Sequence, residues 1–353
     1  MEDTLYIIAG KMGRVSGIVN ALPANMEMEA VVDLMVAEAI KTSEIEGEYY
    51  SRKDVMSSIR NNLGLNHDHV HDKQADGLGQ LMVLIRNTYR HPLTVDRIFE
   101  WHRLLMQARK GINPGTWRTH SEPMQVVSGS VSNPRVHYEA PPSNRVPAEM
   151  EQFLNWFNET APGGAQEIRK GPIRSAIAHL YFESIHPFED GNGRIGRAIA
   201  EKALSQGLGR PALLSLSKTI ETEKKQYYQA LESAQRSNEI TEWITYFVNA
   251  ILKAQTDAET QVNFTLQKVK FFDRYLDNLN ERQLTVIRKM FEFGPAGFEG
   301  GMNAKKYMSI AKTSKATATR DMQDLLVKEA FIHFGNSGGR STRYQLNIEP
   351  QLV

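Results

Sequence analysis

The 353-residue chain contains no cysteine. Disulfides, thiolate metal ligands and cysteine nucleophiles are therefore excluded. The sequence also lacks an unbroken apolar run of about 18 residues, so we expect no transmembrane helix and no membrane partner. At the N-terminus, acidic residues precede a very short apolar patch in MEDTLYIIAG, an order that does not fit a secretory signal. Together these absences predict a cytoplasmic protein.

Net charge is almost absent as well, at +1, so bulk electrostatics predict neither a nucleic-acid nor a membrane partner. The charge is nevertheless uneven along the chain. Met302–Leu346 contains eight Lys and Arg against three Asp and Glu, a local +5, so the remainder carries −4. Hydrophobic residues at 41% and charged residues at 24% are typical of a globular chain. We therefore expect a basic module attached to a mildly acidic globular body.

Most of the sequence has the apolar spacing of helices. Met26–Ile45 is a long stretch of this kind, and Ser51–Asp54 resembles a capping box that opens a helix ending at Gly64. Further helices before residue 256 are expected at Leu78–Tyr89, Val95–Ala108, Ala148–Asn158, Ile173–Ile185, Thr222–Arg236 and Trp243–Ala254. No period of about 20–50 residues recurs, which argues against a solenoid. The expected fold class is all-α.

One stretch, Ile112–Pro142, departs from the helical pattern. Two short β-prone runs, Gln125–Val127 and Arg135–Tyr138, flank Ser128–Pro134, which predicts a hairpin. A small hairpin inside a helical domain is either a functional element or an ordinary surface excursion. The local pattern does not separate these two interpretations.

A domain boundary is predicted between Thr256 and Phe272, where the sequence is polar and then amphipathic. Beyond it, helices are expected at Asn280–Phe293, Ala304–Ala311 and Ser314–Lys328, followed by strands at Phe331–Phe334 and Arg343–Leu346 around the turn Gly335–Gly339. Three helices and a hairpin are the outline of a winged helix-turn-helix. The chain therefore divides into an N-terminal helical region (1–110), a helical core (111–255) and a winged-helix-like C-terminal domain (256–353).

The stretch His186–Arg197 carries the chemistry, because it combines a glycine-rich turn with the start of a helix. Gly191 and Gly193 allow a tight loop whose backbone N–H groups point inward. The positive end of the following helix joins them, which gives an anion hole suited to phosphate. Arg194 and Arg197 share one face of that helix and can bracket further phosphate oxygens.

Two further side chains in this stretch could bind a metal ion or accept a proton. Asp190 offers a hard oxygen for Mg²⁺, which binds through one or two carboxylates plus substrate phosphates. His186 is the side chain here that can take up a proton near neutral pH. Taken singly, each residue has an ordinary interpretation as a cap, a turn or a solvated charge. Their order in one segment favours a functional site.

The segment His186–Arg197 matches the Fic motif HxFx(D/E)GNGRxxR at every fixed position, so the chain resembles the Fic family. The resemblance extends over about Gly115–Phe247, with Ala176–Glu183 as the lead-in to the motif. It implies a mainly helical Fic core with a small β-hairpin flap. It also implies a transfer of AMP from ATP to the Ser, Thr or Tyr hydroxyl of a target protein, with self-modification as an expected side reaction.

The resemblance assigns roles to individual positions. His186 would deprotonate the target hydroxyl, and Asp190 would hold Mg²⁺. The expected phosphate ligands are Gly191, Asn192 and Gly193 on the α- and β-phosphates, and Arg194 and Arg197 on the β- and γ-phosphates. Tyr228 falls where an adenine contact is expected. The flap, which would align the target segment by strand-like pairing, corresponds to Val126, Val127, Ser128 and Gly129.

Thr42–Gly47 fits the family's inhibitory pattern (S/T)xxxE(G/N), with Thr42, Glu46 and Gly47 at the fixed positions. In this interpretation Glu46 competes with the γ-phosphate for Arg197, and ATP then binds in a pose unsuited to attack. The ordinary alternative is a solvated helix end.

The C-terminal module has candidate nucleic-acid contacts on its third helix and on its wing: Ser314, Lys315, Thr317, Thr319, Arg320, Arg340 and Arg343. Such residues suit phosphate and groove contacts on DNA. The same fold also serves dimerisation or docking of a target protein, and a homodimer is the second expectation.

Three alternatives to adenylyl transfer stay open at this point. The transferred group could be UMP, phosphocholine or a phosphate, although Gly191 and the intact Asn192–Arg194 favour the ordinary ATP groove over the kinase-like variant. The enzyme could remove AMP, with Glu46 aligning a water. Alternatively, the chain could be a DNA-binding regulator whose Fic core senses nucleotide. The target protein and the event that relieves inhibition are not encoded in any recognisable motif.

Overall fold

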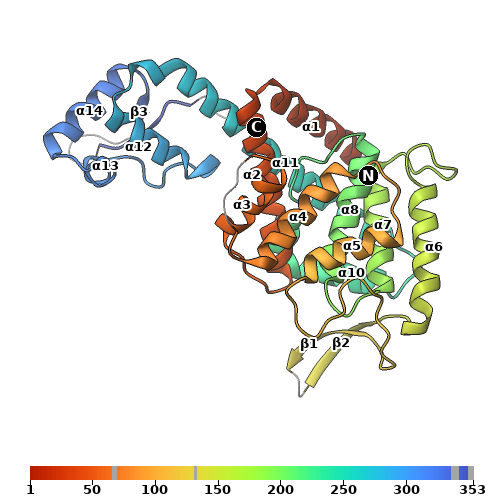
Figure 1. Ribbon diagram of the computed structural model, residues 1–353. Coiled ribbons are helices and arrows are strands. Elements are labelled where there is room, and N and C mark those ends of the chain that lie inside the picture. The colour runs from red at the N-terminus through yellow and green to blue at the C-terminus, as the bar shows by residue number, and fades with distance from the viewer. Residues whose placement is uncertain (66–69, 131–132, 335–341, 349–353) are drawn as a thin grey trace. The chain divides into compact units, whose positions relative to one another are not determined.

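The computed structural model describes residues 1–65, 70–130, 133–334 and 342–348, and these residues are mainly helical (Figure 1). The α-helices are α1 (Glu2–Ala21), α2 (Ala24–Ile45), α3 (Arg52–Asn62), α4 (Lys73–Asn87), α5 (Val95–Met106), α6 (Val146–Glu159), α7 (Gly171–Ile185), α8 (Asn192–Leu208), α9 (Leu216–Thr222), α10 (Lys224–Ala234), α11 (Thr241–Tyr275), α12 (Glu281–Phe291), α13 (Ala304–Ala311) and α14 (Lys315–Val327). Short 3₁₀ turns are η1 (Ser143–Arg145), η2 (Leu276–Asn278) and η3 (Gly294–Ala296). The strands are β1 (Gln125–Ser130), β2 (Asn133–Glu139), β3 (Phe331–His333) and β4 (Tyr344–Leu346). Within the described ranges, no helix is long and apolar enough to cross a bilayer.

The chain forms two compact units, one of residues 1–13 and 31–258 and the other of residues 14–30 and 259–353. The larger unit is built around α7 and α8, the most extensively packed helix pair of the described residues. Phe182 and Ile185 of α7 and Ile195 and Ile199 of α8 are almost completely buried there. Because the motif loop connects these two helices, their core fixes both ends of the loop.

The N-terminal helix α1 has no counterpart among the helices predicted from the sequence. Its apolar residues Ile8, Met12, Val15 and Val19 recur every three or four positions and are all buried. This spacing is the signal of an amphipathic helix, and it extends beyond the short patch considered above.

Most predicted helices are found within a few residues of their expected ends, and three details differ. Ser51 does precede α3, but its side chain makes no capping hydrogen bond, so the predicted capping box is wrong. The predicted helix Thr222–Arg236 corresponds to α10, whereas the short helix α9 before it has no predicted counterpart. The predicted boundary Thr256–Phe272 lies inside α11, and the division between the two units falls within this helix. The helix continues because buried apolar residues such as Val262 keep its helical period.

The predicted hairpin is present as the antiparallel pair β1–β2 (Figure 1). Its register shifts between Val126 and Val127, as in a β-bulge. In β2, the Tyr138 hydroxyl donates to the backbone oxygen of Ser184 at 2.6 Å. The hairpin is thereby attached to the last turn of α7, directly before the motif loop.

The smaller unit contains the predicted order of three helices and two strands. Its core includes the buried residues Val286, Tyr307, Leu325 and Phe331. Strands β3 and β4 pair in antiparallel fashion. The predicted turn Gly335–Gly339 and the candidate residue Arg340 lie outside the described residues.

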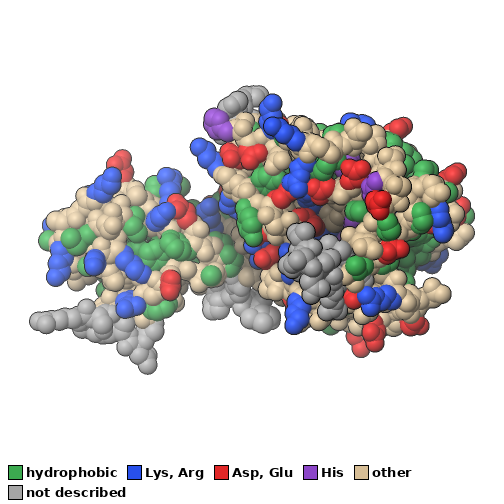
Figure 2. Space-filling view, turned by 90° about the horizontal axis from the view of Figure 1, so that it is seen from below, with side chains coloured by type: hydrophobic (Ala, Val, Ile, Leu, Met, Phe, Trp, Pro, Cys, Tyr) green, Lys and Arg blue, Asp and Glu red, His purple; other side chains and the backbone are tan. Residues whose placement is uncertain are grey.

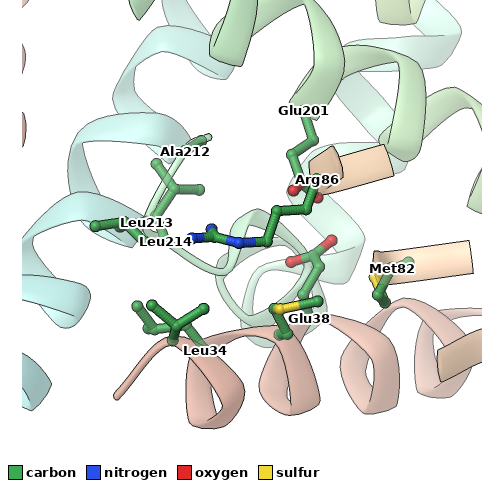
Figure 3. Close-up of a pocket in the computed structure, with 10 residues that line it drawn as sticks. Leu34, Glu38, Met82, Arg86, Glu201, Ala212, Leu213 and Leu214 are labelled. Carbon is green, nitrogen blue, oxygen red and sulfur yellow. The ribbon is translucent and has the colours of Figure 1, made fainter. Parts of the chain in front are cut away.

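A cluster of ionisable side chains joins three helices of the larger unit (Figure 3). Glu38 of α2, Arg86 of α4 and Glu201 of α8 line one pocket together with apolar residues. Glu38 accepts hydrogen bonds from Ser215 and Ser217 at the start of α9. For Glu201, burial and the nearby Glu38 raise the pKa to about 8, and Arg86 opposes this shift. Glu201 therefore stays protonated in the folded protein at neutral pH.

The folded protein then retains a proton that the unfolded chain loses near pH 4.5, so this group lowers stability as the pH rises from about 4.5 to about 8. We expect Glu201→Gln to raise the free energy of unfolding by about 1–3 kcal/mol at pH 8 and by little at pH 5. Urea unfolding at both pH values measures this difference. Glu151→Gln, on the exposed face of α6, is the control and should show no such pH dependence. An equal effect of Glu201→Gln at the two pH values would contradict the assignment.

Candidate active site

The motif loop is a sharp reversal between α7 and α8. His186 ends α7 in the left-handed region, with φ 50° and ψ 58°, and Gly191 precedes α8 with φ 85°. The side chain of Asn192 accepts the Phe188 N–H at 2.9 Å and donates to the Phe188 carbonyl at 2.8 Å. The side-chain amide of Asn192 is used inside the loop, so the group of Asn192 that can bind an anion is its backbone N–H. The loop leaves the N-terminal turn of α8 beside His186.

Arg118 holds the unusual backbone at His186. Its side chain donates to the carbonyl oxygens of His186 at 2.8 Å and Ile185 at 3.3 Å, and its backbone N–H donates to Pro187 at 3.0 Å. A left-handed conformation is strained for a residue with a Cβ and persists where the surroundings enforce it. Arg118 could not be predicted from the sequence, because a side chain that acts on backbone atoms leaves no motif near the loop.

His102 supports the loop from the other side. Its Nδ1 accepts the Gly115 N–H at 2.8 Å, which leaves the ring proton on Nε2, 3.2 Å from the Asp190 carbonyl oxygen. The ring also stacks on Phe188 with centroids 3.8 Å apart. Burial lowers the pKa of His102 to about 4, so the ring stays neutral and keeps this tautomer at neutral pH. His102 was also missed from the sequence.

The segment Thr42–Gly47, which the sequence predicts to be inhibitory, contacts the motif helix α8. Glu46 Oε1 lies 2.7 Å from Arg197 Nη2, and Arg197 also donates to the hydroxyl and the carbonyl oxygen of Thr42 at 2.7 and 2.9 Å. A Cβ placed on Gly193 would be 2.3 Å from the same carboxylate oxygen. Burial opposes the charged form of Arg197, but Glu46 raises its pKa above the usual value. The Glu46 carboxylate therefore pairs with the Arg197 guanidinium and also covers the first turn of α8 at Gly193.

A second carboxylate, Glu48, lies beside the first. It pairs with Arg194 and, at 2.5 Å, with Arg109, and the Tyr50 hydroxyl donates to it at 2.6 Å. Burial opposes ionisation of Glu48, yet Arg194 together with Tyr50 and Arg109 lowers its pKa. Asp190 closes the ring, 2.9 Å from Arg109 and 3.5 Å from Arg194. Two arginines and two carboxylates thus alternate at the mouth of the loop.

The surroundings of Asp190 can be compared with those that a magnesium ligand requires. No group of three or more metal-ligating side chains occurs in the ranges that the structure describes. Mg²⁺ in nucleotide sites takes one or two carboxylates and completes its shell with phosphates and water, so a single carboxylate at an anion hole fits. The Asp190 oxygens face Arg109 and Arg194, and Arg109 would have to move to admit the ion.

The remaining predicted residues lie near this centre. Tyr228 on α10 is 37% exposed, and its ring lies 5.1 Å from that of the buried Tyr227. Burial raises the pKa of Tyr228, the Glu46 charge raises it further, and the Arg197 charge opposes the shift. Of the flap residues, the backbones of Val126–Gly129 are paired in β1, and their side chains are outside the described set.

His186, Asp190, Arg194 and Arg197 are brought together around the first turn of α8, and burial lowers the pKa of His186 to about 4. A helix N-terminus flanked by arginines can bind anions, and here the Glu46 carboxylate covers it; a neutral imidazole next to it can accept a proton. The class of protein defined by this fold and site is a helical domain with an anion-binding loop and an adjacent base.

The comparisons with known proteins agree with that class. Residues 92–204 match the Fic/DOC family, and residues 1–65 match a domain of unknown function, DUF4172. Two curated relatives are protein adenylyltransferases: fic-1 of Caenorhabditis briggsae, 27% identical over 41% of this chain, and Fic of Nematostella vectensis, 26% identical over 45%. A uridine 5'-monophosphate transferase of Xanthomonas campestris is 29% identical over 33% of the chain. The matches span 21% to 33% of these relatives' own lengths.

Solved structures show the same fold. A Fic family protein from Desulfovibrio desulfuricans G20 superposes with a TM-score of 0.52 at 20% identity, covering 98% of this chain and 97% of that one. A Fic domain containing signaling protein from Bacteroides thetaiotaomicron gives 0.53 at 16% identity, over 72% of this chain and 97% of the other. At these identities the likeness concerns the fold.

Proposed function

We propose that the protein is an autoinhibited protein adenylyltransferase, which moves AMP from ATP to a hydroxyl side chain of a target protein. The observation that carries this proposal is the Glu46 carboxylate at Arg197 and over Gly193, because it lies where a phosphate anion would bind. The Fic/DOC match and the relatives named as adenylyltransferase and uridylyl-type transferase support a nucleotidyl transfer.

We assign phosphate binding, proton transfer and metal binding to different residues of the site. The first turn of α8 and Arg194 and Arg197 bind phosphate oxygens once the two carboxylates have left. His186 takes the proton of the target hydroxyl as its oxygen attacks the α-phosphorus, and pyrophosphate leaves. When Mg²⁺ is bound at Asp190, it neutralises charge on the phosphates. Such a transfer depends on positioning and charge compensation more than on covalent work by the protein.

The identity of the nucleotide is tested directly by competition. In the Glu46→Gly protein, label should move to protein from α-labelled ATP, and excess unlabelled UTP should reduce the incorporation far less than excess ATP. Preferred transfer from labelled UTP would assign the chemistry of the Xanthomonas relative instead. Release of AMP from a protein already modified would assign the removal reaction.

Asp190→Asn in the Glu46→Gly background should lower transfer by about 100-fold and weaken its dependence on Mg²⁺, because the amide keeps the shape of the side chain but loses its charge. A Mg²⁺ titration of the initial rate measures both effects. Glu189→Gln is the matched control, since this neighbouring carboxylate is exposed and pairs with none of the motif arginines. A full Mg²⁺ response in the Asp190 variant would require another metal ligand.

For the smaller unit we propose a winged-helix module that binds DNA. Ser314 caps α14 through the Thr317 N–H, and Lys315, Thr319 and Arg320 are exposed along that helix. Figure 2 shows several Lys and Arg side chains on the visible face of this unit. The exposed Arg343 guanidinium donates to the Gly300 carbonyl oxygen at 2.9 Å, so part of its capacity serves the unit itself.

Replacing Lys315 and Arg320 together by Gln should weaken DNA binding and reduce the slope of log affinity against log salt by about 2, because each lost phosphate contact retains about one counterion. Fluorescence anisotropy with a labelled duplex between low and physiological salt measures the slope. Replacement of Lys289 and Arg288 on α12 serves as a charge-matched control. Absence of any salt-sensitive binding by the unaltered protein would favour docking of a protein or a second copy of the chain.

A further inference from the structure

One buried carboxyl next to His186 has no role in the chemistry described so far. Glu183 lies on α7, one turn before His186, and is 5% exposed. Its Oε2 is 3.8 Å from His186 Nδ1. Within the part of the chain that the structure describes, neither Glu183 Oε1 nor His186 Nδ1 has a hydrogen-bond partner of normal geometry, although the Glu183 backbone carbonyl also acts on the ring and raises the His186 pKa against the effect of burial. Unsatisfied buried polar atoms are rare in folded proteins and call for an explanation.

The space for this carboxyl is provided by a glycine on the motif helix. A Cβ built on Gly196 would lie 2.3 Å from Glu183 Oε1 and 3.2 Å from the carboxyl carbon. Gly196 occupies a variable position of the motif, so the motif itself does not require a small residue there. The absence of a side chain at this position therefore lets the Glu183 carboxyl lie between α7 and α8, beside the catalytic imidazole.

The charged and titratable groups that face Glu183 come from each element around it. They are His179 and His186 on α7, Arg197 on α8, Tyr227 and Tyr228 on α10, and Glu46 beyond the end of α2. Arg197 favours the ionised form of Glu183, and Glu46 disfavours it. His179 is bound to Tyr227 through Nε2 at 2.7 Å, and its Nδ1 is a further buried nitrogen without a hydrogen-bond partner among the described residues.

We propose that Glu183 is the positioning residue that sets the tautomer and raises the basicity of His186, an inference that rests on the proposed function. As a carboxylate, Glu183 accepts the hydrogen on Nδ1, which leaves the Nε2 lone pair free for the target hydroxyl. During transfer the hydroxyl proton passes to Nε2, the new oxygen–phosphorus bond forms and the bond to pyrophosphate breaks. The resulting imidazolium is stabilised by the carboxylate until the proton returns to solvent.

This role gives the reaction a defined pH dependence. Burial raises the pKa of Glu183 to about 8, with Arg197 opposing and Glu46 adding to the shift. When protonated, the carboxyl donates its hydrogen to Nδ1, and the ring then carries its own hydrogen on Nε2, where it cannot accept a proton. Transfer therefore rises with pH as Glu183 ionises. An isolated imidazole whose pKa is lowered to about 4 would be a weak base and would show no such rise.

The kinetic test uses the Glu46→Gly protein as the parent. Glu183→Gln should lower kcat by about 100-fold, leave the KM for ATP within about twofold, and abolish the rise of kcat with pH that the parent shows. Gly196→Ala displaces the same carboxyl without changing its chemistry and should also lower kcat, whereas Glu183→Asp should retain part of the pH dependence. Glu189→Gln should leave the profile unchanged. An unchanged kcat and pH profile in both Glu183→Gln and Gly196→Ala would overturn the proposal.

A second measurement separates this proposal from the proposed function. The ¹⁵N chemical shifts of the His186 ring in the unaltered protein should change from a hydrogen on Nε2 at pH 6 to a hydrogen on Nδ1 at pH 9.5, and Glu183→Gln should remove the change. If the Glu46→Gly parent transfers no nucleotide, the proposed function fails while this measurement still decides the pairing. One tautomer at both pH values would overturn the role of Glu183.

Discussion

The Glu46→Gly protein is expected to transfer AMP at least about 100-fold faster than the unaltered protein. The change removes the carboxylate that lies 2.7 Å from Arg197 Nη2 and over Gly193, so the guanidinium and the first turn of α8 become available to the triphosphate. The α-phosphate can then align with the incoming hydroxyl, and misplacement by about 1 Å can cost about 100-fold in rate. Initial rates with a generic hydroxyl-rich protein and with the enzyme as its own acceptor measure the gain.

A gain of this kind is informative because most substitutions destabilise a protein and reduce its activity. The matched control is Glu44→Gly, which removes a carboxylate from the same helix end. Glu44 pairs with Lys41 at 2.5 Å rather than with a motif arginine, so its loss should leave the rate low. A folded Glu46→Gly protein that binds ATP and is no faster than the control would contradict autoinhibition by Glu46.

Glu48 gives this account an internal check. Because Glu48 pairs with Arg194 and Arg109, removal of Glu46 alone leaves one motif arginine engaged. We therefore expect Glu48→Gln to add to the effect of Glu46→Gly by lowering the KM for ATP, without activating the enzyme to the same degree when introduced alone.

The second large effect is a loss. His186→Ala in the Glu46→Gly background should lower kcat by about 10²–10⁴-fold, the range expected for removal of a general base. ATP affinity should stay within a few-fold, because the imidazole acts on the hydroxyl, whereas the phosphates are bound by the α8 turn and the arginines. Single-turnover rates and calorimetric titration with ATP measure the two quantities separately.

His186→Gln is the companion variant, since it keeps a polar side chain at the left-handed position that Arg118 holds. Equal losses of ATP binding and of rate in both variants would indicate that the loop has collapsed. Retained transfer with an intact loop would remove His186 from the role of base.

The sequence alone located the centre of the site because its parts lie within one segment. His186, Asp190, Arg194 and Arg197 are close in the chain: His186 ends α7, Asp190 lies in the loop, and the two arginines lie in the first turns of α8. The residues that support them come from elsewhere: Arg118 and His102 act on backbone carbonyl oxygens of the loop, and neither lies in a recognisable pattern. Contacts of that kind follow from tertiary packing, which local periodicity does not report.

The charges around the segment Thr42–Gly47 illustrate the same limit. Glu46 could be inferred because it belongs to a pattern, whereas Glu48 follows two residues later and meets Arg109 and Arg194 only in the folded chain. Glu183 lies within the lead-in to the motif, but its proximity to His186 Nδ1 depends on the missing side chain of Gly196.

Short-range signals predicted most of the helices, but they did not predict that α11 continues from Ala254 to Tyr275. The predicted boundary Thr256–Phe272, where the sequence is polar and then amphipathic, contains the division between the two compact units at Ala258. Polar residues also line an exposed helix face, and Phe264, Phe271 and Tyr275, seven and four positions apart, form a buried stripe on another face of the helix. A boundary between two compact units can therefore lie inside a continuous helix.

The central claim is that a nucleotidyl group is transferred once Glu46 no longer occupies the phosphate site. The most direct measurement incubates Glu46→Gly protein with ATP labelled at the α-phosphorus and, in parallel, at the γ-phosphorus, and follows label on protein. The account predicts incorporation from the α-label, release of pyrophosphate in equal amount, and none from the γ-label. Incorporation from the γ-label would contradict adenylyl transfer and indicate a kinase, and no incorporation from either label by a folded, ATP-binding protein would contradict the account as a whole.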